Sequence, residues 1–114
     1  MTGNHFHVLV RNLEETLGWM ETVWQLEPVH RGKAFAVLPF GETLLLLDSS
    51  DQDSQVTLGF NSANCDEDYR AVLSRGAISL EEPADRSWGV RAAYVKGPGG
   101  LTLEIEQPLG KPHK

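Results

Sequence analysis

The sequence has one cysteine, few basic residues and no long apolar run, and each shortage excludes a class of protein. Cys65 stands alone among 114 residues, so neither an intrachain disulfide nor a cysteine zinc cluster can form. Ten Lys and Arg face sixteen Asp and Glu, and this formal charge of −6 disfavours nucleic acid and anionic membrane surfaces as partners. No apolar run is long enough to cross a membrane. The charge favours a neutral or cationic small ligand over a polyanion.

The start of the chain also lacks a feature, because residues 1–5 have neither the basic start nor the apolar core of a secretion signal. We therefore expect a cytoplasmic protein. A length of 114 residues with 40% hydrophobic residues is typical of one globular domain. Cys65 is interpreted as a small residue near the start of a helix.

The first half of the chain reads as a strand, a helix and three more strands. Residues 5–11 alternate apolar and polar side chains, which predicts a strand with one face on a core. The stretch 12–25 then shows apolar residues at helical spacing, and Asn12 is a plausible N-cap. Short strands are predicted at the three stretches that follow, 27–31, 33–40 and 43–48.

The second half repeats this order. An alternating strand starts at Val56, and a helix is predicted over 64–76, with Asn64 as its N-cap and Gly76 just after its last turn. Further strands are predicted at the remaining alternating stretches, 77–81, 91–96 and 101–107. Asn12 and Asn64 lie 52 residues apart, which indicates a duplicated unit.

The repeat predicts an α+β protein built from two pseudo-symmetric βαβββ modules. The predicted divisions are module one over 5–48, a polar linker over 49–55, module two over 56–107 and a tail over 108–114. The linker lacks periodic apolar residues, and its Asp residues lack the Gly and final Glu of a calcium loop.

The repeat also predicts which residues occupy equivalent positions in the two modules. His5 corresponds to Thr57 at the start of the second module, 52 residues on. When the turn glycines Gly41 and Gly100 are aligned, Glu104 in the last strand corresponds to Leu45. We expect the four positions to line one cavity if both halves curl their sheets around a shared centre.

Three stretches together resemble the vicinal-oxygen-chelate superfamily, which includes glyoxalase I, bleomycin-resistance proteins and extradiol dioxygenases. They are "HFHVLVRNLEETLGWM", "DEDYRAVLSRGA" and "EEPADRSWGVRAAYVKGPGGLTLEIEQP", and the resemblance covers about 5–107. It implies a curved mixed-sheet cup, a homodimer and, in the enzymes, a divalent metal such as Zn, Ni, Mn or Fe. His5 matches the metal ligand of the first strand, and Glu104 matches that of the last strand.

The set of metal ligands implied by the resemblance is incomplete in this sequence. Thr57 stands where many members place a second His, Leu45 stands where glyoxalase I places a Glu, and Gly97 and Gly99 replace both Asp residues of the closing turn. Catalytic zinc sites generally use three protein ligands, so His5 and Glu104 alone make a poor site. His7 shares the face of His5, two residues further along the strand.

Three functions remain open on this basis. The favoured one is a metal-free protein that binds a small molecule in the cup, with no cofactor. The second is a metal-dependent lyase, isomerase or thiol transferase that uses His5 and Glu104 as ligands. The third is a metal-free enzyme with Glu104 as general base. The candidate ligand-binding residues are His5, His7, Thr57, Asn61, Trp88 and Glu104. For Trp88, stacking on a ligand and anchoring the core are equally plausible roles.

Overall fold

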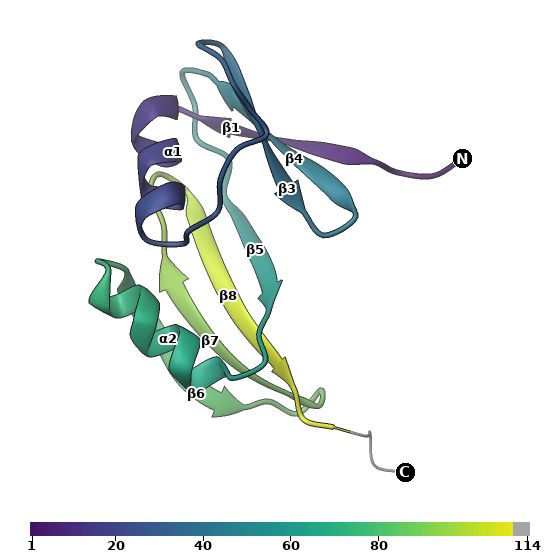
Figure 1. Cartoon of the computed structure of the whole chain (residues 1–114), viewed down its shortest axis with the longest axis vertical. Coiled ribbons are helices and arrows are strands. Elements are labelled where there is room, and N and C mark those ends of the chain that lie inside the picture. Colours follow the sequence, from purple (N-terminus) through teal and green to yellow (C-terminus); the bar gives the residue numbers. More distant parts are fainter. Residues whose placement is uncertain (111–114) are drawn as a thin grey trace. The chain divides into compact units, whose positions relative to one another are not determined.

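The computed structural model describes residues 1–110 and contains two helices and eight strands in the predicted order (Figure 1). The described chain divides into two compact units, each with a four-stranded sheet and one helix: residues 1–56 with 98–100, and residues 57–97 with 101–110. The elements are β1 (His5–Val10), α1 (Leu13–Thr22), β2 (His30–Arg31), β3 (Phe35–Phe40), β4 (Thr43–Ser49), β5 (Val56–Asn61), α2 (Cys65–Ser74), β6 (Ile78–Asp85), β7 (Val90–Lys96) and β8 (Leu101–Pro108).

In the first unit the strand order is β1-β4-β3-β2, with β1 parallel to β4 and the other pairs antiparallel. Alternate residues of β3 and β4 are buried, which is the pattern of strands with one face on a core. α1 contacts β4. Its own buried residues recur at helical spacing, because side chains three and four residues apart share a helix face. The core of this unit comprises Val8, Val10, Leu13, Leu17, Met20, Val23, Ala36, Leu38, Leu45 and Leu47.

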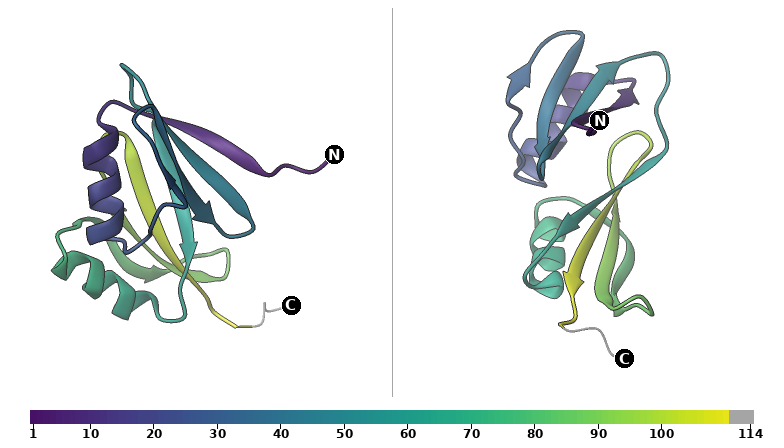
Figure 2. Two further views of the ribbon diagram at one scale, coloured as in Figure 1. Left: turned by 45° about the horizontal axis from the view of Figure 1, so that its top comes forward. Right: turned by 90° about the vertical axis from the view of Figure 1, so that its right-hand side faces the viewer.

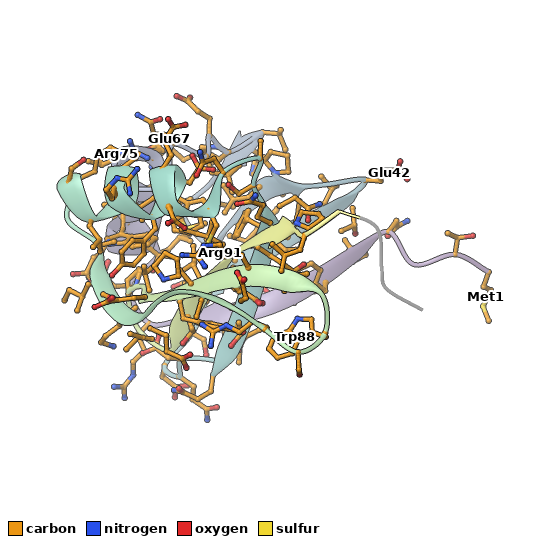
Figure 3. The ribbon with its side chains drawn as sticks, turned by 90° about the horizontal axis from the view of Figure 1, so that it is seen from below. Met1, Glu42, Glu67, Arg75, Trp88 and Arg91 are labelled. Atoms are coloured by element: carbon orange, nitrogen blue, oxygen red, sulfur yellow. The ribbon has the colours of Figure 1, made fainter. Side chains whose placement is uncertain are left out.

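In the second unit the strand order is β5-β8-β7-β6, and α2 contacts β6, β7 and β8. Figure 2 shows α2 along one face of this sheet. Arg91 of β7 ties the helix to the sheet, because its guanidinium donates to Asp66 of α2 at 2.7 Å and to Asp85 of β6 at 2.9 Å (Figure 3). The hydrogen bond from Arg91 holds the pKa of Asp66 below its ordinary value. Cys65, the first residue of α2, is fully buried as a small residue near the helix start, as predicted.

The two helix caps confirm the 52-residue repeat. The side-chain oxygen of Asn12 accepts a hydrogen bond from the backbone N–H of Glu15 at 3.0 Å, and that of Asn64 accepts from Glu67 at 3.1 Å. Each cap satisfies one of the N–H groups that a helix leaves unpaired at its start. Gly76 has φ 116°, a left-handed conformation that suits glycine after a helix end, also as predicted.

Several predicted ends are wrong. α1 ends at Thr22 instead of Gln25, because Gln25 adopts φ 60° and turns the chain out of the helix. The strand expected over 27–31 is reduced to β2, since Pro28 has no N–H to give to a sheet. β6 runs on to Asp85, through two register shifts against β7.

The polar stretch before β5 has no helix or strand but is fixed to β1 by hydrogen bonds. The N–H of Leu9 donates to Ser54 Oγ at 2.9 Å, and the N–H of Ser54 returns a bond to the Leu9 carbonyl. Asp53 accepts from the N–H of Arg11 at 2.8 Å. The predicted tail starts at the last residue of β8, and its residues 111–114 lie outside the described part. No helix within residues 1–110 is both long and apolar enough for a membrane span.

Candidate functional site

One face of the second sheet carries no helix, and we call it the open face. Neighbouring residues of a strand point to opposite faces, and Arg91 points to α2 because it binds Asp66. Ala93 and Val95 share that direction by strand alternation, so Ala92 and Tyr94 lie on the opposite face. The open face comprises Thr57, Gly59 and Asn61 of β5, Ala92 and Tyr94 of β7, and Thr102, Glu104 and Glu106 of β8.

Glu104 is held in place on the open face by Tyr94. The two residues are cross-strand partners in the β7–β8 ladder. The Tyr94 hydroxyl donates to Glu104 Oε2 at 2.9 Å, and both side chains are half-buried. A hydrogen bond to a carboxylate is charge-assisted and therefore stronger than a neutral one. Tyr94 consequently fixes the direction of the Glu104 carboxylate.

Arg86 covers the other side of Tyr94. Its guanidinium carbon lies 5.4 Å from the centre of the Tyr94 ring, a cation–π distance. One terminal nitrogen forms an ion pair with Glu81 at 3.1 Å, and the other donates to the Ala92 carbonyl at 2.9 Å. Within residues 1–110, Arg86 Nε is buried without a partner. The positive charge of Arg86 is thus compensated by Glu81, while Glu104 forms no ion pair in this part of the chain.

Gly59 lies beside the second oxygen of Glu104. A Cβ placed on Gly59 would lie 3.3 Å from Glu104 Oε1, so glycine leaves the space beside this oxygen free of a side chain from residue 59. Gly59 is exposed. Oε2 is engaged by Tyr94, whereas Oε1 has no hydrogen-bond donor among residues 1–110. The carboxylate therefore keeps one free acceptor atom.

The two candidate histidines both lie on β1 of the first unit, on the exposed face of that strand. His5 Nδ1 lies 2.6 Å from Asn4 Oδ1, and His7 Nδ1 lies 2.6 Å from Asp48 Oδ2. Their rings meet edge to face, with centroids 5.1 Å apart. One nitrogen of each ring is thus already engaged by a neighbouring side chain.

Leu45 does not occupy the position predicted for it. It is fully buried, while its neighbour Leu44 is 40% exposed and pairs with His5. Gly59, which lies beside Glu104, is 52 residues after His7, so the residue that corresponds to Glu104 is Leu46, the partner of His7. The alignment of turn glycines was wrong because the turns differ in length. Phe40 pairs with Thr43 around two residues, whereas Lys96 pairs with Thr102 around five, and an odd shift in register exchanges the two faces.

The remaining candidates are on the surface. Trp88 lies in the turn between β6 and β7 and is 60% exposed, so the alternative of a core anchor is wrong (Figure 3). Thr57 and Asn61 are exposed on β5. Within residues 1–110, no hydrogen bond, ion pair or ring contact involves the side chain of either residue or that of Trp88.

The described residues do not fit the metal site implied by the resemblance. Within residues 1–110, no group of three or more His, Cys, Asp or Glu side chains is placed to hold a metal ion. Thr57 is a weak ligand, and Leu46, which corresponds to Glu104, cannot bind a metal at all. We therefore derive no chemical step through a metal.

Three residues around Glu104 were not predicted as site residues: Gly59, Arg86 and Tyr94. Tyr94 follows two buried alanines, so the alternation around it gives no clear face. Counting back from the turn reveals it, because pairing of Lys96 with Thr102 places Tyr94 opposite Glu104. No sequence pattern marks Gly59 or Arg86 as a site residue. The role of Gly59 depends on its distance from Glu104, and that of Arg86 on its distance from Tyr94.

We expect Tyr94 to ionise only at unusually high pH. Burial, and then the hydrogen bond to Glu104, raise its pKa above the ordinary value of tyrosine. Because the folded state favours the neutral phenol, this stabilisation is complete below the unfolded-state pKa and is lost as the pH rises through the folded-state pKa. The difference in ultraviolet absorbance between wild type and Tyr94→Phe during an alkaline titration isolates this phenol. Ionisation at or below the ordinary tyrosine pKa contradicts the described contact.

No family model matches the sequence, and comparison with curated protein sequences yields no match either. Solved structures do match. A glyoxalase/bleomycin resistance protein/dioxygenase from Nocardioides is 22% identical, with a TM-score of 0.81 over 100% of this chain and 89% of the other. A glyoxalase-related enzyme from Fulvimarina pelagi is 14% identical, with a TM-score of 0.80 over 99% and 92%. A "conserved domain protein" is 21% identical, with a TM-score of 0.83 over 95% and 99%.

Identities this low establish a shared fold and leave the activity open. The order of elements agrees with this conclusion, since each unit contributes one strand, one helix and three further strands. The chain therefore has the α+β fold of the glyoxalase, bleomycin-resistance and dioxygenase proteins.

Proposed function

We propose that the protein binds a small molecule on the open face of the second sheet, without a metal ion. The observation that carries this proposal is the Glu104 carboxylate, which is held by Tyr94 through one oxygen and keeps the other free beside Gly59. A polar group that is fixed in direction and has a free acceptor atom is what a binding site uses to orient a ligand. Thr57 and Asn61 extend the polar surface along β5.

The likeness to bleomycin-resistance and glyoxalase structures supports this proposal at the level of the fold. The side chains that could bind a metal favour ligand binding over metal-dependent catalysis, since no group of three such ligands exists within residues 1–110. The net charge of −6 agrees with a neutral or cationic ligand. A cytoplasmic location, a homodimer and the module divisions 5–48 and 56–107 stay predictions.

Elemental analysis and thermal unfolding test the metal-free part of the proposal. Nickel, manganese, zinc and EDTA are each added to wild type, His5→Ala and Glu104→Ala, with His30→Ala as a control for nonspecific binding by an exposed histidine. We expect no stoichiometric metal in the purified protein and no shift in Tm that depends on His5 or Glu104. A bound metal whose stabilising effect disappears in both variants, and persists in His30→Ala, overturns the proposal in favour of a metal-dependent enzyme.

A further inference from the structure

The two oxygens of the Glu104 carboxylate are in different surroundings. Oε2 accepts the Tyr94 proton at 2.9 Å, whereas Oε1 faces the side on which β5 carries Gly59. An ionised carboxylate has only acceptor sites, so the partner that Oε1 lacks must be a hydrogen-bond donor. The ligand group that meets Oε1 is therefore an N–H or O–H.

The charges around Glu104 favour a positively charged donor. Arg86 is the cation that lies against Tyr94, and its guanidinium is shared by Glu81 and the Ala92 carbonyl. Tyr94 is a neutral phenol at neutral pH, as tyrosines ordinarily are, and burial raises its pKa further, so it donates to Glu104 without neutralising it. A half-buried carboxylate with no ion-pair partner within residues 1–110 gains most from an ammonium or amidinium group.

Gly59 leaves the space in which such a group fits. An N⁺–H donor sits about 2.7–2.9 Å from a carboxylate oxygen. A Cβ on residue 59 would lie 3.3 Å from Oε1 and occupy part of that space. The φ of Gly59 is not among the positive values, so the backbone itself does not require glycine at this position. Glycine is therefore needed at this position for its small size, which leaves room for the donor beside Oε1.

We propose that the open face selects small organic cations that donate an N–H to Glu104 Oε1, with Gly59 as the residue that admits them. This inference rests on the proposed function and assigns its ligand class. Tyr94 acts as a positioning residue, because it touches the carboxylate and holds it toward the ligand without contacting Oε1.

Four probes that share one phenyl ring separate charge from hydrogen bonding. They are benzylammonium, benzyltrimethylammonium, benzyl alcohol and benzoate, and their binding is followed in the amide NMR spectrum of the metal-free protein. We expect benzylammonium to bind at least about tenfold more tightly than benzyl alcohol, as charge-assisted hydrogen bonds predict. Benzyltrimethylammonium, which has no N–H, is expected to bind more weakly than benzylammonium, and benzoate least.

Three variants locate the effect. We expect Glu104→Gln to weaken benzylammonium binding about tenfold and to leave benzyl alcohol unchanged. Gly59→Ala is expected to weaken benzylammonium binding with little change in Tm, because the stabilising loss of a strand glycine is offset by the tight approach of the new Cβ to Oε1. Gly18→Ala in α1 is the matched control, since no atom lies within 4 Å of its added Cβ, and it is expected to raise Tm without any change in binding.

The outcomes distinguish the two proposals. Equal binding of benzylammonium and benzyltrimethylammonium, or benzylammonium affinity unchanged in Glu104→Gln, overturns the inference about an N–H donor. If benzyl alcohol or benzoate binds the open face most tightly, the proposed function stands and the ligand class is wrong. If none of the four probes perturbs the amides of Gly59, Tyr94 and Glu104, both the ligand class and the proposed function fail.

Discussion

Gly100→Ala is expected to cost about 3 kcal/mol or more of unfolding free energy, a large part of the stability of a small domain. A Cβ at this position would lie 2.2 Å from the backbone oxygen of Ser54 and 2.7 Å from the Gln55 side-chain nitrogen. Real Cβ atoms essentially never approach another heavy atom that closely. A backbone oxygen is harder to displace than the end of a flexible side chain.

The surrounding hydrogen bonds make this clash difficult to relieve. Ser54 bonds to Leu9 through its N–H and its Oγ, and the N–H of Val56 donates to the Gly100 carbonyl itself at 3.1 Å. Moving residues 54–56 away from a new methyl group breaks these bonds. The cost therefore combines steric overlap with lost hydrogen bonds.

Gly41→Ala is the matched control for Gly100→Ala. Gly41 stands in the corresponding turn of the first module, has φ 63° and has no atom within 4 Å of an added Cβ. Only backbone strain opposes alanine there, which amounts to about 1 kcal/mol. Urea unfolding of both variants measures the difference. A cost of less than 1 kcal/mol for Gly100→Ala, or a cost equal to that of Gly41→Ala, contradicts the described packing of Gly100.

Leu45→Ala is expected to destabilise the protein by about 2–5 kcal/mol, whereas Leu44→Ala costs less than about 1 kcal/mol. Leu45 is 0% exposed in the core of the first unit, so removing its side chain leaves a cavity. Leu44 is 40% exposed, and water already reaches much of its side chain. The two residues are adjacent and chemically identical, so the pair controls for composition and strand propensity.

This comparison also tests the register of β4. If Leu44 and Leu45 were exchanged between faces, as the alignment of turn glycines predicts, the order of the two costs would be reversed. Urea unfolding measures the two costs, because a shift of the midpoint at an unchanged m value reports a change in the free energy of unfolding. A larger loss for Leu44→Ala would show that Leu45 faces outward beside His5 and His7.

The fold was predictable because each module carries strong local signals. Asn12 and Asn64 cap helices at the predicted positions, and alternating apolar residues identify the longer strands. The ends of elements depended on tertiary effects, such as the left-handed conformation of Gln25. Neither the sequence pattern nor its resemblance to a family carried information on that conformation.

The candidate site was predictable only in part. The alternation of β8 places Glu104 on the face opposite the buried leucines, and the resemblance marks it as a site residue. The side chains that orient it, Tyr94 and Arg86, come from neighbouring stretches whose pairing depends on turn length and bulges. Periodicity within a single strand does not contain that information.

The first module shows why the metal interpretation weakens. Its position equivalent to Glu104 is Leu46, so the pseudo-symmetry supplies no second carboxylate. His7 is engaged by Asp48, and the second-module position 52 residues after His7 is Gly59. The two histidines thus belong to the first module, whereas Glu104 and its hydrogen-bonded neighbours all belong to the second.

The most direct test of ligand binding at Glu104 is an NMR screen of the metal-free protein against a library of small neutral, cationic and anionic compounds. The account predicts that the compounds that bind shift the amide signals of Gly59, Tyr94 and Glu104 most, and that these shifts disappear in Glu104→Gln. Shifts confined to α2 or to the first module, or shifts that persist unchanged in Glu104→Gln, would contradict the account.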